Sequence, residues 1–190
     1  MAHGPHHTTH ETEIKLALPN ARGARLKLLT AGFEVSRKRI LEKNLVFDTA
    51  GRALGQSSRL LRLRQAGRDA TLTYKGVHEG GKHKSREELE VGVADLAAMS
   101  HIVCRLGFQL VFRYEKYRTE FRQPRRAGVA MLDETPIGVF LELEGTPRWI
   151  DRTARLLGFD EDAYITASYG RLYLEWCAAF GRKPANMTFA

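Results

Sequence analysis

The feature that most constrains this chain is a charge pattern that repeats at every second residue. It first appears at Glu11, Glu13 and Lys15, with Thr12 and Ile14 between them. Because side chains along a β-strand alternate between two faces, such a segment carries its charges on one face and its apolar residues on the other. Taken alone, it would be an ordinary half-exposed strand.

The same spacing returns in five further segments, which makes the pattern a property of the whole chain. Together with Asp133, these strand faces supply seven bases, Lys15, Arg62, Arg64, Lys75, Arg86, Lys116 and Arg118. They also supply seven acids, Glu11, Glu13, Glu88, Glu90, Asp133, Glu142 and Glu144. The opposite faces of these strands are apolar almost throughout.

Two arrangements fit this pattern, and they differ in which face is enclosed. In the first, the charged faces form the solvated outside of an antiparallel sheet whose apolar faces make the core. In the second, amphipathic helices cover the apolar faces from outside, and the charged faces line a wide antiparallel barrel. The near absence of Thr, Ser, Gln and Asn from the charged faces favours the second. Charges enclosed in this way must be paired, solvated or bound to ions.

The rest of the chain is consistent with one α+β domain, residues 11–190, preceded by a flexible His-bearing leader at residues 1–10. Strands are predicted at 11–18, 33–48, 58–64, 70–77, 85–93, 108–123, 129–134 and 139–145. Helices are predicted at 20–31, 95–107, 147–158 and 166–180, from capping residues, periodic apolar positions and terminal glycines.

Composition narrows the class of protein further. A hydrophobic fraction of 43% and a charged fraction of 27% are those of a globular protein, and no apolar run approaches membrane-spanning length. Cys104 and Cys177 are too few for a disulfide framework or a Cys-rich zinc site, so both are predicted to pack in the core of a cytoplasmic protein. The net charge of +8 indicates attraction to a polyanion, which could be nucleic acid, an acidic membrane surface or a phosphate-rich small molecule.

A polyphosphate accompanied by a divalent metal suits a barrel interior of this kind. Lys and Arg donate charge-assisted hydrogen bonds to phosphate oxygens. Clustered carboxylates supply the hard oxygen ligands that Mg²⁺ or Mn²⁺ prefers. Interleaved acids and bases therefore favour metal-assisted phosphoryl chemistry over simple anion binding.

The ordered set of residues resembles the CYTH superfamily, also called triphosphate tunnel metalloenzymes. The likeness runs from about residue 11 to residue 177 and includes the helix that contains Ser168 and Tyr169. Class IV adenylyl cyclases, thiamine triphosphatases and inorganic triphosphatases belong to this superfamily. The resemblance implies an eight-stranded antiparallel tunnel with a charged interior and helices packed outside.

The resemblance also implies roles for the individual residues. The expected metal ligands, for Mg²⁺ or Mn²⁺, are Glu11, Glu13, Glu88, Glu90, Glu142 and Glu144. The expected phosphate-binding residues are Lys15, Arg62, Arg64, Lys75, Arg86, Lys116 and Arg118. Lys75 and Asp133 are the expected catalytic residues.

The reaction itself stays open between two chemistries that need the same phosphate cradle. Triphosphate hydrolysis is favoured because nothing in the sequence identifies an adenine pocket; the alternative is a class IV adenylyl cyclase that converts ATP to cyclic AMP and pyrophosphate. The expected substrate is ATP, thiamine triphosphate or inorganic triphosphate, with no stable nucleic-acid partner and no membrane partner, and a homodimer is compatible with the sequence.

A third alternative, a non-catalytic module that binds RNA or polyphosphate, fits less well. Tyr74, Tyr117 and Phe121 alternate to the face opposite the bases, so they are badly placed to stack on nucleic-acid bases.

Overall fold

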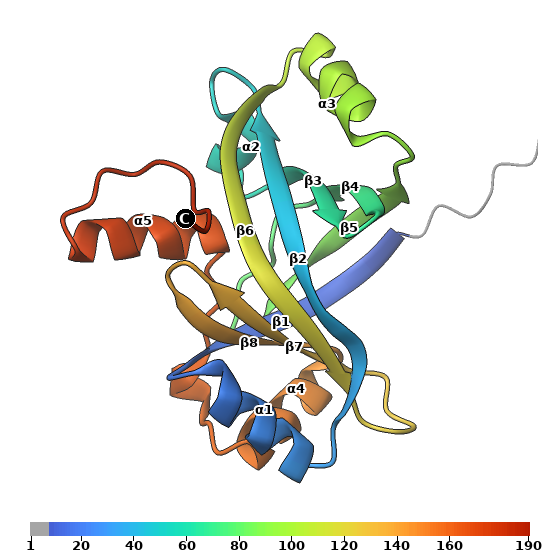
Figure 1. Cartoon of the computed structure of the whole chain (residues 1–190), viewed down its shortest axis with the longest axis vertical. Coiled ribbons are helices and arrows are strands. Elements are labelled where there is room, and N and C mark those ends of the chain that lie inside the picture. Colours follow the sequence, from blue (N-terminus) through green and yellow to red (C-terminus); the bar gives the residue numbers. More distant parts are fainter. Residues whose placement is uncertain (1–7) are drawn as a thin grey trace, which may run out of the picture.

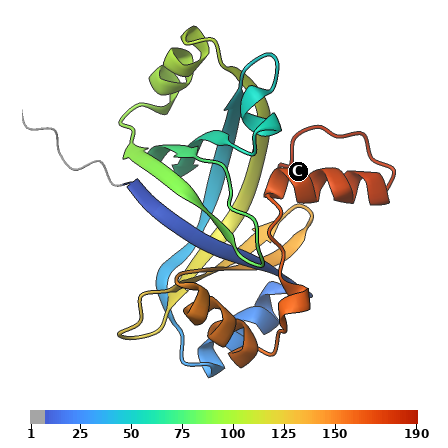
Figure 2. The same ribbon diagram turned by 180° about the vertical axis from the view of Figure 1, so that it is seen from behind.

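The computed structural model describes residues 8–190, which form a closed eight-stranded barrel with helices on its outside (Figures 1 and 2). Going around the barrel, the strand order is β1-β5-β4-β3-β2-β6-β7-β8, and every neighbouring pair is antiparallel. The predicted α+β barrel is thereby confirmed.

The strands agree with the predicted segments to within a few residues. They are β1 (Thr8–Leu18), β2 (Glu34–Asp48), β3 (Leu60–Ala66), β4 (Asp69–Lys75), β5 (Lys84–Gly92), β6 (Gln109–Arg122), β7 (Val129–Thr135) and β8 (Gly138–Glu144). β1 begins earlier than predicted, at Thr8, and residues 1–7 of the predicted leader lie outside the described residues.

The helices are α1 (Ala21–Thr30), α2 (Ala53–Gln56), α3 (Leu96–Arg105), α4 (Pro147–Leu156) and α5 (Tyr169–Ala179), with a short 3-10 helix at Glu161–Ala163. The four long helices begin where the sequence supplies a capping side chain. Asn20 accepts a hydrogen bond from the Gly23 N–H at 2.7 Å, and Asp95 accepts one from the Ala98 N–H at 2.9 Å. Each cap satisfies a backbone donor that the first helical turn leaves free.

Helix α2 was not predicted, since it spans one turn and contains Gly55. The Asp48 carboxylate holds it in place by accepting hydrogen bonds from the N–H groups of Thr49, Leu54 and Gly55, at 2.7 to 2.9 Å. These three donors reach one carboxylate only when the loop is folded, so the periodicity of the sequence does not predict α2.

The main apolar core lies outside the barrel wall, between the wall and helices α1 and α4. Ile14 and Leu16 of β1 point outward into it and are completely buried. Leu28 of α1 and Ile150 of α4 cover them from the other side. The apolar strand faces therefore point away from the barrel axis, as the second arrangement predicts.

Helix α5 and the C-terminal residues make a second apolar cluster at another side of the barrel. Tyr169, Tyr173 and Cys177 are its buried face, and Met187 is 1% exposed against them. Met187 exchanges backbone hydrogen bonds with Arg113 and Glu115 of β6, at 3.0 and 2.9 Å. The tail is thus paired alongside the part of β6 that β7 does not reach.

The two cysteines have different surroundings. Cys177 is buried as predicted, but Cys104 is exposed on α3, about 100° around the helix from the buried Val103. Within residues 8–190, no helix has the length and apolar character needed to cross a bilayer.

Candidate active site: a charged tunnel

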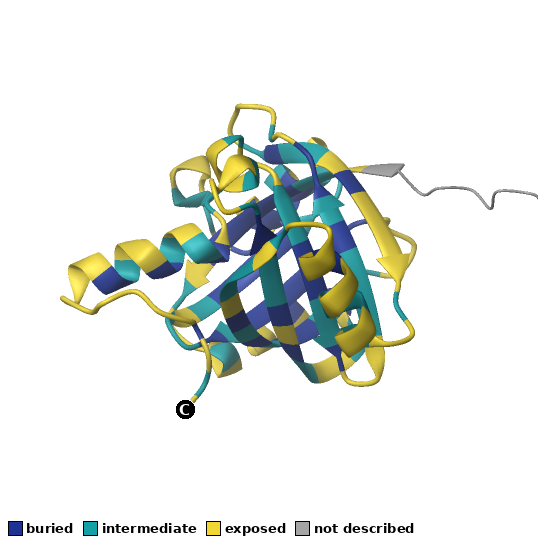
Figure 3. Ribbon diagram, turned by 90° about the horizontal axis from the view of Figure 1, so that it is seen from above, coloured by how far each residue is buried: buried dark blue, intermediate teal, exposed yellow. Residues whose placement is uncertain are grey.

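The barrel encloses a cavity of about 1340 Å³ to which all eight strands contribute side chains. Each strand carries a mixture of buried, intermediate and exposed residues, as Figure 3 shows from above. The inward positions carry the charged residues that the sequence pattern singled out. The prediction that the charged faces point into the barrel is therefore confirmed.

Bases and acids both contribute to this interior, and we call the following sixteen side chains the tunnel network. Its eight bases are Lys15, Arg62, Arg64, Lys75, Lys84, Arg86, Lys116 and Arg118. Its eight acids are Glu11, Glu13, Glu42, Glu88, Glu90, Asp133, Glu142 and Glu144. Most of these side chains are buried, so their mutual attraction is screened far less than at a protein surface.

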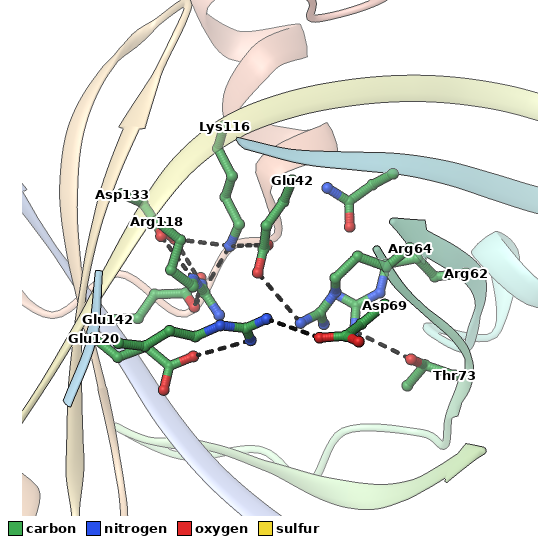
Figure 4. A network of polar contacts seen from close by, with 12 residues as sticks. Glu42, Arg62, Arg64, Asp69, Thr73, Lys116, Arg118, Glu120, Asp133 and Glu142 are labelled. Atoms are coloured by element: carbon green, nitrogen blue, oxygen red, sulfur yellow. Dashed lines mark hydrogen bonds and ion pairs between the residues drawn. The ribbon is translucent and has the colours of Figure 1, made fainter. Parts of the chain in front are cut away.

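Two bases of β6 are at the centre of the network (Figure 4). Lys116 Nζ lies 2.8 Å from Asp133 Oδ2, and the Arg118 guanidinium holds both Asp133 oxygens at 2.7 and 2.6 Å. Arg118 also contacts Glu142, and Lys116 contacts Glu42 at 3.6 Å. Their spacing on one strand places both bases on the same face, where β7 presents Asp133 opposite Arg118.

Asp133 is fully buried and already has all its partners within the protein. The Tyr169 hydroxyl of α5 donates to its Oδ2 at 2.6 Å, in addition to the bonds from Lys116 and Arg118. These contacts favour a role in orienting the two bases rather than contact with a substrate. Tyr169 links α5 to the tunnel, since Lys15 and Lys116 lie 5.3 and 4.9 Å from its ring centre.

The first segment of the pattern lies where β1 changes partners, from β5 to β8. Lys15 Nζ lies 3.4 Å from Glu13 Oε1 on its own strand and 3.3 Å from Glu142 Oε1 on β8, so it links β1 to β8. Lys84 of β5 contacts the same Glu13 oxygen at 3.1 Å. One carboxylate oxygen therefore contacts two ammonium groups.

A second group of charges lies on β3, β4 and β5. Lys75 contacts both Glu88 and, at 3.5 Å, Glu11. Arg62 lies 3.8 Å from Glu88 and donates to the Thr73 hydroxyl at 3.3 Å. These longer separations leave the guanidinium nitrogens less fully satisfied than those of Arg118.

Two glutamates are short of positive charge. Burial, a hydrogen bond with Glu88 and the negative charge of Glu144 raise the pKa of Glu11 to about 8. Burial and the neighbouring charges of Glu13 and Glu142 raise the pKa of Glu144. Carboxylates crowded in this way repel one another, and a bound cation would remove that repulsion.

Other glutamates are held firmly ionised. Burial by itself would raise the pKa of Glu42, but Arg118, Lys116 and Arg64 outweigh it and lower that pKa to about 2. The pKa values of Glu13 and Glu142 also lie well below the ordinary range, because lysines surround both carboxylates.

The donor set fits a hard divalent cation, although most of the carboxylates also contact ammonium or guanidinium groups. Within residues 8–190, no three His, Cys, Asp or Glu side chains already form a metal cluster. Glu11 and Glu144 are the carboxyl groups whose pKa values are raised by burial and by neighbouring acids, and Glu13, Glu88 and Glu142 lie beside them. All of these are oxygen donors of the kind that Mg²⁺ and Mn²⁺ accept.

The structure brings every predicted site residue to the tunnel or its rim. Glu90 is at the rim, with 43% of its side chain exposed, and bonds to Thr73 at 2.8 Å. Arg86 lines the cavity and, within residues 8–190, makes no ion pair. It is the tunnel base most open to an anion.

Sequence reasoning missed five inward residues, Glu42, Asn44, Lys84, Tyr114 and Tyr169. Four of them extend the two-residue spacing by one step or repeat it: Lys84 lies two residues before Arg86, Tyr114 lies two residues before Lys116, and Glu42 and Asn44 share one face of β2. A search that allowed amide and phenol side chains would have found them. Tyr169 lies on a helix, and only the packing of α5 brings it to Asp133.

An eight-stranded antiparallel barrel with a charged interior and external helices defines the class of this protein as a tunnel-type barrel. Residues 9–186 match the CYTH domain, so the chain belongs to the CYTH family. A Methanocaldococcus jannaschii protein named as a candidate adenylate cyclase is 31% identical over 134 residues, covering 70% of this chain and 75% of that protein.

Solved structures share the architecture. A protein of Pyrococcus horikoshii OT3 superposes with a TM-score of 0.75 at 25% identity, over 87% of this chain and 98% of its own. A candidate adenylyl cyclase of Hippeastrum, described as having a dominant triphosphatase activity, superposes with a TM-score of 0.64 at 18% identity, over 92% and 97% of the two chains.

Proposed function

We propose that this protein is a divalent-metal-dependent triphosphatase that processes its substrate inside the tunnel. The observation that carries the proposal is the cavity itself, whose wall carries both bases and acids from β1, β3, β4, β5, β6 and β8. Family membership and the triphosphatase activity described for the Hippeastrum protein support the same chemistry.

The ion pairs of the tunnel network explain why a metal and an anion would be needed together. A triphosphate alone would have to compete with Glu13 and Glu142 for Lys15, and would bring further negative charge beside both buried carboxylates. Such uncompensated buried charge is strongly unfavourable. Mg²⁺ or Mn²⁺, held by Glu11, Glu13, Glu142 and Glu144 with Glu88, would supply positive charge to the phosphate oxygens and the released carboxylates.

The protein's own bases would then hold the phosphate chain. Arg62, Arg86 and Lys75 are the incompletely satisfied donors that would bind the anion first. Lys116 and Arg118, held by Asp133, provide fixed positive charge where negative charge increases in the transition state. In this assignment Asp133 is a positioning residue, and Lys75 contacts the substrate.

A second reaction is favoured by a different observation. The cavity continues toward α5 along an aromatic wall of Phe112, Tyr114 and Tyr173, in which Phe112 stacks on both tyrosines with ring centres 5.8 and 5.7 Å apart. Such a wall can receive the organic part of a nucleoside triphosphate. With the name of the Methanocaldococcus relative, it supports conversion of ATP to cyclic AMP and pyrophosphate as the alternative.

One assay separates these reactions. Purified protein is incubated with ATP and, separately, with inorganic triphosphate, with Mg²⁺, Mn²⁺ or chelator, and the products are separated by anion-exchange chromatography. We expect metal-dependent phosphate release. Cyclic AMP with pyrophosphate would overturn hydrolysis in favour of the cyclase, and metal-independent binding without turnover would overturn both.

A matched pair of variants tests the site. Glu88 and Glu87 are neighbours on β5, but Glu88 points into the tunnel and Glu87 is exposed on the outside. We expect Glu88→Gln to lower turnover by about 100-fold or more, and Glu87→Gln to leave it unchanged. Full activity of Glu88→Gln would contradict the site assignment.

A further inference from the structure

The net charge of the protein does not come from the tunnel. The tunnel network contains as many acids as bases, so the formal charge of +8 belongs to the remainder of the chain. The attraction to polyanions predicted from composition therefore needs another location. Much of it lies on the outer layer formed by α1, α4 and the turn between β6 and β7, which are together at the lower end of Figure 1.

Helix α4 presents a stripe of arginine to solvent. Arg148, Arg152 and Arg155 are exposed and follow one another at spacings of four and three residues, which places them on one side of the helix. The opposite side carries Ile150 and Ala154, both fully buried against the barrel. The arginine stripe therefore points directly away from the barrel.

Helix α1 packs on the same part of the barrel wall and presents a mixed surface. Arg22 and Arg25 are exposed there, and so are Leu26 and Leu29, with 65% and 44% of their surface accessible. Lys27 joins the two helices by donating to the Leu157 carbonyl at 2.9 Å. Both helices cover one core at the same end of the barrel.

The turn between β6 and β7 extends this surface with two more exposed bases, Arg125 and Arg126. Arg126 borders the same small hollow as Arg152 and Leu156 of α4, so turn and helix are adjacent. Gln123 ties the turn to α1 through a hydrogen bond to the Ala31 carbonyl at 3.0 Å. We call the outward sides of α1 and α4, together with this turn, the basic face.

The charge of the basic face is uncompensated. Within residues 8–190, none of its seven guanidinium groups forms an ion pair with a carboxylate. Helix α1 contains no acid, and the single acid of α4, Asp151, points aside to Lys82 and His83. A concentration of arginine without acids is unusual for a surface whose only partner is water, and it favours an anionic partner.

We propose that the basic face docks on the surface of an anionic lipid bilayer. Exposed leucines distinguish this partner from nucleic acid: Leu26, Leu29 and Leu156 are 65%, 44% and 56% exposed among the arginines. Basic side chains attract anionic lipid head groups, and exposed apolar side chains among them add apolar burial at the bilayer interface. Nucleic-acid binding would favour exposed aromatic rings, but Trp149, the aromatic residue of α4, lies directly against Gly128.

Docking through the basic face would leave the tunnel cavity uncovered. None of the seven arginines or three leucines of the basic face lines the tunnel cavity. Membrane docking would therefore place the enzyme at a surface without covering its site, and the inference is independent of the reaction proposed above. It also departs from the sequence-based expectation of no membrane partner.

The test is co-sedimentation of the full chain with vesicles of phosphatidylcholine, with and without about one-third phosphatidylglycerol. We expect the anionic vesicles to bind at least about tenfold more protein, and we expect 0.5 M NaCl to remove most of that binding. Arg148→Glu with Arg152→Glu should lower binding about tenfold or more. Leu26→Ser with Leu29→Ser should lower it several-fold and leave its salt dependence unchanged.

A control variant has the same change in net charge at a remote surface. Arg105 at the end of α3 and Lys183 after α5 are exposed and do not belong to the basic face, so Arg105→Glu with Lys183→Glu should bind vesicles like the unmodified protein. Equal binding to both kinds of vesicle, or equal loss in the control, would overturn the proposal. Stronger binding to a short RNA duplex, lost in Arg148→Glu with Arg152→Glu but not in the leucine variant, would overturn it in favour of nucleic acid.

Discussion

Glu42 shows how strongly a single tunnel residue depends on its neighbours. Its carboxylate is 1% exposed and faces Arg64 and Lys116, at 3.6 Å from each. Burial of one acid would normally favour its neutral form, yet here the surrounding bases keep it ionised. The same bases would be left unpaired if Glu42 lost its charge.

This environment predicts an acid-sensitive contribution to stability. The pKa of Glu42 falls from 4.5 to about 2 on folding, so its stabilising contribution is complete above pH 4.5 and declines as the pH falls toward 2. A shift of this size corresponds to roughly 3 kcal/mol. We expect Glu42→Gln to be less stable than the unmodified protein by about that amount at pH 7, with the difference shrinking as the pH falls toward 2.

Urea unfolding at pH 7, 5 and 3.5 measures this difference. Glu34→Gln is the matched control, because Glu34 is exposed on the same strand and should change stability little at any of these pH values. A pH-independent difference between Glu42→Gln and the unmodified protein would show that the effect is packing and not charge.

At the scale of elements, the loop between β4 and β5 is clamped to α4 by one acid. Asp151 accepts hydrogen bonds from Lys82 at 2.9 Å, from His83 at 2.7 Å and from the Tyr164 hydroxyl at 3.2 Å. The residue after His83 is Lys84, whose ammonium group reaches Glu13 inside the tunnel. A contact outside the barrel wall thus fixes the start of a strand that carries tunnel residues.

Removal of the Asp151 charge should therefore loosen the loop. We expect Asp151→Asn to lower the free energy of unfolding by about 1–2 kcal/mol and to accelerate amide hydrogen exchange in residues 76–84. Mass-spectrometric exchange measures the second effect. Asp162→Asn, on the exposed turn nearby, should leave exchange in the loop unchanged, and equal acceleration in both variants would contradict a specific clamp.

At the scale of the whole molecule, charge is divided between a balanced interior and a basic exterior. If the proposed function holds, the phosphate chain and the metal would each need the other in order to bind, because each would satisfy the groups that the other displaces. Coupled binding of this kind stabilises the folded protein.

Thermal unfolding should reveal this coupling. We expect a non-hydrolysable triphosphate analogue with Mg²⁺, at about 100 times its dissociation constant, to stabilise the protein by roughly 2.7 kcal/mol, which is an increase in Tm of about 5–10 °C. The metal alone and the analogue alone should each give much smaller increases. Additive effects of the two, measured by scanning calorimetry, would contradict the exchange of partners inside the tunnel.

The sequence by itself determined most of the architecture, because the side-chain period of a strand fixes which residues share a face. Once the segments from Glu11 to Glu144 are taken as strands, one face is charged and the other apolar, and the near absence of uncharged polar residues favours a barrel with outer helices over an open sheet. Capping residues such as Asn20 and Asp95 fixed the helix starts for equally local reasons.

Only the tertiary structure decided what local patterns cannot encode. The contact of Tyr169 with Asp133 and the clamp of Asp151 on Lys82 join residues far apart in the chain, so they depend on how helices dock on the wall. The exact pairing of tunnel charges also depends on barrel closure, which brings β8 beside β1. Barrel closure brings acids and bases together inside the tunnel. The excess positive charge lies outside the tunnel network, where it can attract an anionic partner.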